Sequence, residues 1–143
     1  MHLVVLERNE DVGVRLVAPP GFVTKAIYGA RSRTKPALLA ELAQAFEFPA
    51  YTGRNWDALE ECLADLEWLP AEGYLLVVTD ADQLLGESPE DYGTFLEVME
   101  TVAAEWAAGR TGEWPRPPAP FHVCLTVREG RESARTWGVP RLP

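Results

Sequence analysis

Short apolar runs typical of β-strands alternate along the chain with segments whose apolar residues recur every three or four positions, as in amphipathic helices. The most continuous run, YLLVVT at 74–79, is apolar almost throughout, which is typical of a strand buried on both faces of a parallel sheet. FVTKAIYG at 22–29 predicts a strand before it, and FHVCLTV at 121–127 predicts a strand after it. Because helical segments separate these strands, we expect an α/β fold with a small three-stranded parallel sheet packed against helices.

Three segments between the strands carry the start signals of helices. The first, over residues 34–46, begins with Thr34 as its N-cap. The second, over 55–66, begins with Asn55, which is another favourable N-cap. The third and strongest segment, over 88–109, begins with Ser88 as its N-cap, followed by Pro89, and stops at Gly109.

The ends of the chain are less regular. HLVVLER and VRLVAP flank the turn-like NEDVG, so we expect an N-terminal β-hairpin at residues 2–18. TGEWPRPPAP at 111–120 predicts a proline-rich loop, and no pattern places the polar tail at 128–143. A chain of 143 residues most often folds as one domain, so we expect a single domain over 1–143.

Composition narrows the classes of function. The chain has 22 acidic and 13 basic residues, a formal charge of -9 and a pI near 4.7, which argues against nucleic acid as a partner and favours a basic protein. No apolar run is long enough to span a membrane, and charged residues appear too early for a signal peptide. We therefore expect a cytoplasmic protein that binds no membrane. Cys62 and Cys124 lack CxxC spacing and predict buried free thiols.

The carboxylates are concentrated in the middle of the chain. From Asn55 to Gly109 there are fourteen carboxylates and no lysine or arginine, so every basic residue lies outside this segment. A charge run usually marks solvated helix faces, but such faces normally interleave both signs to gain stabilising pairs four residues apart. The single sign therefore favours a surface that attracts a cationic partner.

Motifs of catalysis and cofactor binding are absent from the sequence: it has no glycine-rich phosphate loop, no GxSxG and no HExxH. We interpret His122, which alternates within a predicted strand, as structural. The strongest enzyme alternative is a metal site at Asp80 and Asp82, which follow a buried strand at the edge where α/β proteins bind ligands. A cap of the next short helix by Asp80 is the simpler interpretation, so we expect no enzymatic activity, no cofactor and no metal.

The segment over 55–66 predicts an amphipathic helix with an acidic face. At about 100° per residue its apolar residues share one side, and the other side carries Asp57, Glu60, Glu61, Ala64 and Asp65.

The connector before this helix contains Tyr51 at a position where no hydrophobic period requires a ring. Tyr51 either leans on the core or stands exposed beside the acidic helix as a binding residue. Gly53 is expected to supply the positive φ that turns the connector into the helix.

The stretch FPAYTGRNWDALEECLADL carries a family resemblance. Ten positions match in register over fifteen residues: Pro49, Tyr51, Gly53, Asn55, Trp56, Asp57, Ala58, Leu59, Cys62 and Leu63. In this pattern the chain resembles the barstar family, the intracellular inhibitors of barnase-type ribonucleases. The likeness continues in order and spacing from about Phe22 to Val127, and leaves residues 1–20 and 128–143 outside it.

The resemblance implies a protein inhibitor, whose acidic helix and connector enter the cationic cleft of a basic extracellular-type ribonuclease in place of RNA phosphate. It implies that Glu61 pairs with the catalytic arginines and histidine, that Asp57 supports Glu61, and that Tyr51 stacks on the catalytic histidine. Glu105 matches a peripheral carboxylate of the family. The expected partner-binding residues are therefore Tyr51, Gly53, Asn55, Asp57, Glu60, Glu61, Ala64, Asp65 and Glu105.

The chain departs from the family pattern at the acidic helix and at one position of the last helix. Glu61 stands where the family has aspartate, Glu60 replaces a tryptophan, residues 64–66 replace a Thr-Gly-Trp run, and Thr101 replaces a glutamate. A longer carboxylate suits a cleft of different shape. Beside the enzyme alternative at Asp80 and Asp82, two functions therefore remain open: inhibition of a ribonuclease with its own cleft, and a barstar-like immunity module for a different basic partner or toxin.

Overall fold

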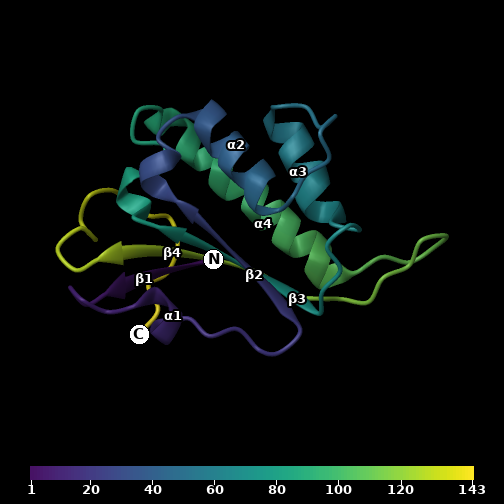
Figure 1. Ribbon diagram of the computed structural model, residues 1–143, viewed down its shortest axis with the longest axis horizontal. Helices are drawn as coiled ribbons and strands as arrows, with labels where there is room; N and C mark the ends of the chain where they lie inside the picture. Colours follow the sequence, from purple (N-terminus) through teal and green to yellow (C-terminus); the bar gives the residue numbers. More distant parts are fainter.

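The computed structural model describes the backbone of residues 1–143 and every side chain except that of Val14. Its centre is a four-stranded sheet, in the order β1-β4-β3-β2, in which all neighbouring strands are parallel (Figure 1). The strands are β1 (His2–Leu6), β2 (Phe22–Tyr28), β3 (Gly73–Thr79) and β4 (Phe121–Arg128). The predicted α/β class and parallel sheet are confirmed, and the predicted number of three strands is wrong.

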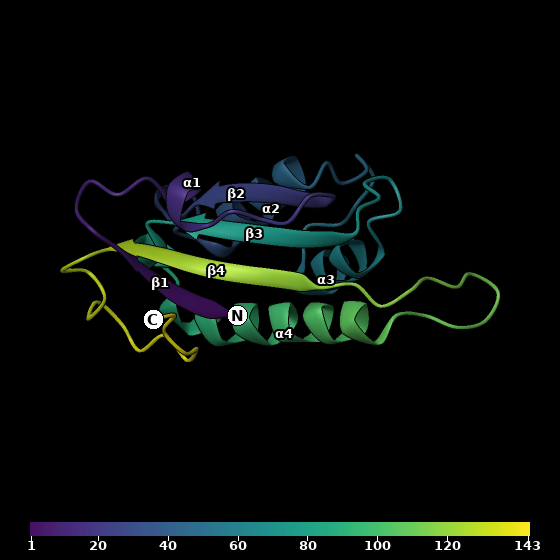
Figure 2. The same cartoon turned by 90° about the horizontal axis from the view of Figure 1, so that it is seen from below.

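One face of the sheet is covered by three helices (Figures 1 and 2), α2 (Lys35–Ala45), α3 (Trp56–Asp65) and α4 (Tyr92–Ala108). Two predicted N-caps are confirmed: the Thr34 hydroxyl accepts from the Ala37 amide at 3.3 Å, and the Asn55 side chain accepts from the Ala58 amide at 2.8 Å. The predicted N-cap at Ser88 is wrong, because α4 begins at Tyr92 and the Ser88 side chain makes no capping hydrogen bond. Short 3-10 turns occupy Gly29–Arg31, Ala81–Gln83 and Pro89–Asp91. Among the described residues, no helix is both long enough and apolar enough to cross a membrane.

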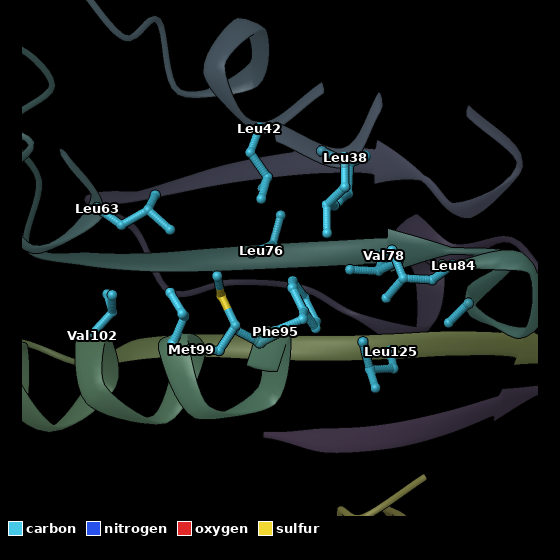
Figure 3. Close-up of a cluster of buried hydrophobic side chains, with 14 of the residues drawn as sticks. Leu38, Leu42, Leu63, Leu76, Val78, Leu84, Phe95, Met99, Val102 and Leu125 are labelled. Atoms are coloured by element: carbon cyan, nitrogen blue, oxygen red, sulfur yellow. The ribbon is translucent and has the colours of Figure 1, made fainter. Parts of the chain in front are cut away.

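The main core lies between these helices and the sheet (Figure 3). β3 runs through its centre, and its YLLV segment and Val78 are buried, as the apolar run predicted. The side chains that surround β3 come from all three helices and from β4: Leu38, Leu42, Leu63, Phe95, Met99, Val102 and Leu125. Truncating a buried leucine of such a core costs about 2–5 kcal/mol, so the inner side of α3 is firmly held.

The N-terminal hairpin does not form. β1 instead pairs in parallel with β4, with His2 opposite Cys124. The segment that spans the expected turn and the expected second hairpin strand contains no strand; it forms α1 (Val12–Arg15), a single helical turn on the face of the sheet opposite α2, α3 and α4 (Figure 1). The physical reason is burial, because the apolar residues of this segment cover a second cluster on that face, formed by Val4, Leu6, Leu75, Val77 and Cys124.

The C-terminal tail, which no sequence pattern placed, returns to the free edge of β1. The Leu3 amide donates to the Pro140 carbonyl at 2.9 Å, and the Leu142 amide donates to the Leu3 carbonyl at 2.8 Å. Trp137 is buried, and its carbonyl accepts from the Tyr92 hydroxyl of α4 at 2.7 Å. The tail therefore joins β1 to α4.

Candidate functional site

α3 has the boundaries that its sequence predicts, to within one residue at each end, and its leucines and two of its carboxylates lie on the predicted faces. Leu59, Leu63 and Leu66 are buried, whereas Asp57 and Glu61 are exposed. The helix ends at Leu66, which adopts the left-handed conformation at φ 47° while its amide donates to the Cys62 carbonyl at 3.0 Å. Burial of the Leu66 side chain holds this residue in a backbone conformation that non-glycine residues seldom adopt.

The separation of acidic and basic residues along the sequence is only partly kept in the folded structure, because some carboxylates of the acidic segment form ion pairs. Three carboxylates of the Asn55–Gly109 segment meet arginines from outside it: Glu87 with Arg33 at 3.5 Å, Asp82 with Arg131 at 3.6 Å and Glu105 with Arg110 at 3.9 Å. Among the described side chains, no lysine or arginine lies within 4.0 Å of the carboxylates of Asp57, Glu60 or Glu61. The acidic face of α3 therefore keeps its charge unpaired.

The connector presents its ring to solvent. Tyr51 is 90% exposed, which decides between the two alternatives in favour of an exposed ring beside the helix. The connector is fastened by a turn in which the Thr52 amide donates to the Pro49 carbonyl at 3.0 Å, and by a contact of 3.6 Å between the Thr52 hydroxyl and the Cys62 sulfur. Both cysteines are free, but Cys62 is only half-buried, contrary to its predicted burial.

The predicted positive φ at Gly53 is wrong, because Gly53 is not among the described residues that have one. The chain reverses one step earlier, in the turn from Pro49 to Thr52. A β-carbon at Gly53 would lie 3.2 Å from the amide nitrogen of the Asn55 side chain. The absence of a side chain at Gly53 therefore leaves room for the residue that caps α3.

The outer-face position predicted for Ala64 is also wrong, since its side chain is only 3% exposed. The end of α3 is covered by α4 and by the loop that follows α4. The Trp106 indole donates to the Leu63 carbonyl at 2.8 Å, and the guanidinium groups of Arg110 and Arg116 donate to the Ala64 carbonyl at 2.9 and 2.6 Å. Helical periodicity within α3 cannot reveal this cover.

Arg116 is the residue of this region that sequence reasoning missed. Its guanidinium lies 3.3 Å from the centre of the Trp106 ring, and burial lowers its pKa, as does the charge of Arg110. The two arginines compensate the negative end of the α3 dipole. A signal was present in the sequence, because Arg110 and Arg116 are the first basic residues after the long acidic segment.

The remaining predicted site residues lie around this framework. Asn55 is exposed and caps α3, while Glu60 and Asp65 are half-buried on its outer side. Glu105 is exposed near the end of α4 and forms only the long ion pair with Arg110, which contributes little at a surface. Of the nine predicted partner-binding residues, all except Ala64 are accessible to solvent.

Two hollows flank α3. A pocket of about 370 Å³ lies between α2 and the connector, lined by Leu39, Phe48, Gly53, Asn55 and Leu59 among others. A larger groove of about 600 Å³ lies at the carboxyl end of α3, and we refer to it as the α3-end groove. Its lining includes Asp65, Glu67, Tyr74, Trp106, Trp114 and Arg116.

The predicted alternative of a metal site at Asp80 and Asp82 gains no support from geometry. Asp82 pairs with Arg131, so its carboxylate already has a cationic partner. Asp80 is exposed and makes no side-chain cap bond, so its predicted capping role is wrong as well. Within the described part of the chain, no group of three histidine, cysteine or carboxylate residues is arranged to hold a metal ion.

Comparison with known proteins and protein families identifies the family to which the chain belongs. No individual curated protein matches it. The sequence profile of the family described as Barstar (barnase inhibitor) matches residues 22–123, which include the connector, α3 and α4. Because this match covers well over half of the 143 residues and the structure has a parallel sheet packed against helices, the chain belongs to the barstar family.

Proposed function

We propose that the protein inhibits a basic, barnase-type ribonuclease by presenting the acidic face of α3 and the ring of Tyr51 to the cationic cleft of the enzyme. The observation that carries this proposal is the pair of exposed, unpaired carboxylates of Asp57 and Glu61, one helical turn apart, in a member of a family described as barnase inhibitors. The proposed contact residues are Tyr51, Gly53, Asn55, Asp57, Glu60, Glu61, Asp65 and Glu105. Ala64 is left out because its side chain is buried.

The electrostatic basis of the proposal is simple. A ribonuclease cleft must be cationic to hold the RNA backbone, and this protein carries a formal charge of -9. Attraction between exposed charges acts over a Debye length of about 8 Å at physiological salt, so the unpaired carboxylates of α3 guide the encounter as well as the final pairing. Inhibition then needs no chemistry beyond occupying the place of phosphate.

Glu61 is the proposed centre of the contact. It lies one turn after Asp57 and one turn before Asp65, so a cleft that receives α3 excludes water around it most completely. Removing one partner of a buried ion pair costs about 3–5 kcal/mol, because the other charge is left desolvated. Even if the interface retains some water, Glu61→Ala should weaken binding more than tenfold, mainly through faster dissociation.

The test is a titration of the protein into a barnase-type ribonuclease while cleavage of a fluorogenic RNA is followed. The ribonuclease is the one encoded in the source genome, or barnase where none is encoded. Glu61→Ala is compared with Glu90→Ala, which removes an exposed carboxylate from the 3-10 turn that precedes α4. Glu61→Gln keeps the size of the side chain and covers the case in which alanine disturbs folding. Parent-like inhibition by both Glu61 variants, or no inhibition by the parent, would refute the proposal.

The second candidate function is an immunity module for a different basic protein. The observation that favours it is the carboxyl end of α3, where Arg110 and Arg116 cover Ala64 in the region that departs from the family pattern. The two functions differ in a measurable way. An immunity module would bind its basic partner through Glu61 and leave RNA cleavage by barnase-type enzymes unchanged.

A further inference from the structure

The proline-rich loop after α4 projects from the rest of the molecule (Figures 1 and 2). Residues 110–120 extend away from the helices and the sheet (Figures 1 and 2, green to yellow-green). Two hydrogen bonds close the base of the loop, from the Arg110 amide to the Arg116 carbonyl at 2.9 Å and from the Arg116 amide to the Arg110 carbonyl at 3.0 Å. Four prolines lie at 115, 117, 118 and 120. Proline restricts the backbone, so the part of the loop that follows Trp114 loses little conformational entropy when the loop binds.

The loop is fastened to the proposed recognition helix. Arg110 and Arg116, which close its base, are the same residues whose guanidinium groups donate to the Ala64 carbonyl at the end of α3. A partner that covers the outer face of α3 therefore meets this loop at the carboxyl end of the helix.

Trp114 stands on this loop without a role in the core. Its side chain is 82% exposed, and it borders the α3-end groove together with the buried rings of Tyr74 and Trp106. Tryptophan is strongly enriched among the few residues that dominate binding energy in protein interfaces. Trp114, an exposed indole on a projecting loop beside a groove, therefore has the features of a residue that dominates the binding energy of an interface.

The charges that line the groove are acidic on balance, with three carboxylates against two guanidinium groups. Asp65, Glu67 and Glu72 line it, and Glu113 precedes the tryptophan. The arginines that also line the groove are already engaged, since Arg116 stacks on Trp106 and donates to Ala64, and Arg110 donates to the same carbonyl. The chemistry that fits is a lysine or arginine side chain, whose stem packs on the indole while its charge meets the carboxylates.

We propose that Trp114 and the acidic rim of the α3-end groove bind a lysine- or arginine-bearing surface segment of the same ribonuclease, outside the cleft that α3 enters. This inference rests on the proposed function, because it requires that α3 docks on a ribonuclease. The groove then gives the inhibitor selectivity among ribonucleases, whose clefts all bind RNA but whose flanking segments differ.

The experiment measures inhibition by Trp114→Ala against the same barnase-type ribonuclease used for Glu61. Tyr28→Ala is the matched control, because Tyr28 is another exposed ring, on the edge strand β2. We expect Trp114→Ala to weaken binding about tenfold or more and Tyr28→Ala to leave it unchanged. Hydrogen–deuterium exchange of the parent complex should also show protection of residues 111–114, a result that does not depend on any variant folding.

The outcomes separate this inference from the proposed function. Weakening by Glu61→Ala without an effect of Trp114→Ala, together with unprotected amides at 111–114, overturns the groove and leaves the α3 contact standing. Parent-like binding by both variants overturns both. Weakening by Trp114→Ala that matches a similar loss in Tyr28→Ala also overturns the groove, because a specific contact cannot involve both rings.

Discussion

Arg116→Met should release the carboxyl end of α3 while keeping a long apolar side chain over Trp106. The variant removes the guanidinium that lies 3.3 Å from the centre of the indole ring. It also removes a hydrogen bond of 2.6 Å to the Ala64 carbonyl and a longer one of 3.4 Å to the Asp65 carbonyl. Methionine retains packing on the Trp106 ring, so the loss of folding stability in this variant measures mainly the contribution of the charged guanidinium group.

The expected destabilisation is about 2 kcal/mol. A hydrogen bond from a charged donor contributes about 1.5–3 kcal/mol. The cation–π contact adds about 0.5–1 kcal/mol. Against these gains, the Nε and one Nη of Arg116 are buried with no hydrogen-bond partner in the described part of the chain, and burial lowers the Arg116 pKa. Because desolvation of the guanidinium offsets part of its contribution, the net effect lies toward the lower end of the sum.

Urea unfolding followed by circular dichroism measures this effect. Arg31→Met is the matched control, because Arg31 lies 4.9 Å from the centre of an exposed ring, that of Tyr28, and no hydrogen bond from its guanidinium to a helix carbonyl is seen. The control should lose less than about 0.5 kcal/mol, as exposed positions do. Equal losses in the two variants, or a gain of stability in Arg116→Met, would show that the α3 carbonyls do not depend on this arginine.

Three further outcomes are expected. The association rate with a basic ribonuclease should fall as ionic strength rises, because the acidic face of α3 is unpaired; a flat rate in stopped-flow measurements would remove electrostatic guidance. Burial raises the pKa of Tyr92 to about 12, against about 10 when unfolded, so the folded state keeps a proton that the unfolded state has lost, and stability should fall as pH rises between these values. Tyr92→Phe should reduce this loss of stability with pH in urea unfolding measured at alkaline pH, and an unchanged dependence of stability on pH would contradict the assignment to Tyr92. At neutral pH the same variant should lose about 1 kcal/mol of stability, because the hydrogen bond to the Trp137 carbonyl is removed. Gly29→Ala would place a β-carbon against the Asp80 carbonyl and should cost about 1–3 kcal/mol in urea unfolding, whereas a parent-like midpoint would show that the backbone moves freely there.

Local patterns predicted the elements that their own residues determine. The boundaries of α3 follow from the Asn55 cap and from the spacing of Leu59, Leu63 and Leu66, and both appear in the structure. The apolar run of β3 likewise predicted a strand buried on both faces. In these two segments the local residue pattern is sufficient to determine the secondary structure and the buried face, whatever the rest of the chain contributes.

The errors in the number of strands and at Ala64 arose where distant parts of the chain meet. β1 has the composition of a hairpin strand, but its partner is β4, far along the sequence. Ala64 occupies an outward position by periodicity, yet Trp106 and two arginines cover that end of α3. No local pattern encodes such contacts, so the fourth strand and the cover over α3 required the structure.

The pairing of β1 with β4 has a consequence for biosynthesis. β1 is synthesised more than a hundred residues before β4, so at a synthesis rate of about 5–20 residues per second it waits roughly 6–24 s for its partner strand. During that time its four consecutive apolar residues, Leu3 to Leu6, form an unpaired strand that is prone to aggregate. The tail that later pairs with Leu3 closes the remaining edge. Truncation of residues 140–143 should therefore lower the yield of folded protein made at high expression rates, even though these residues lie far from α3.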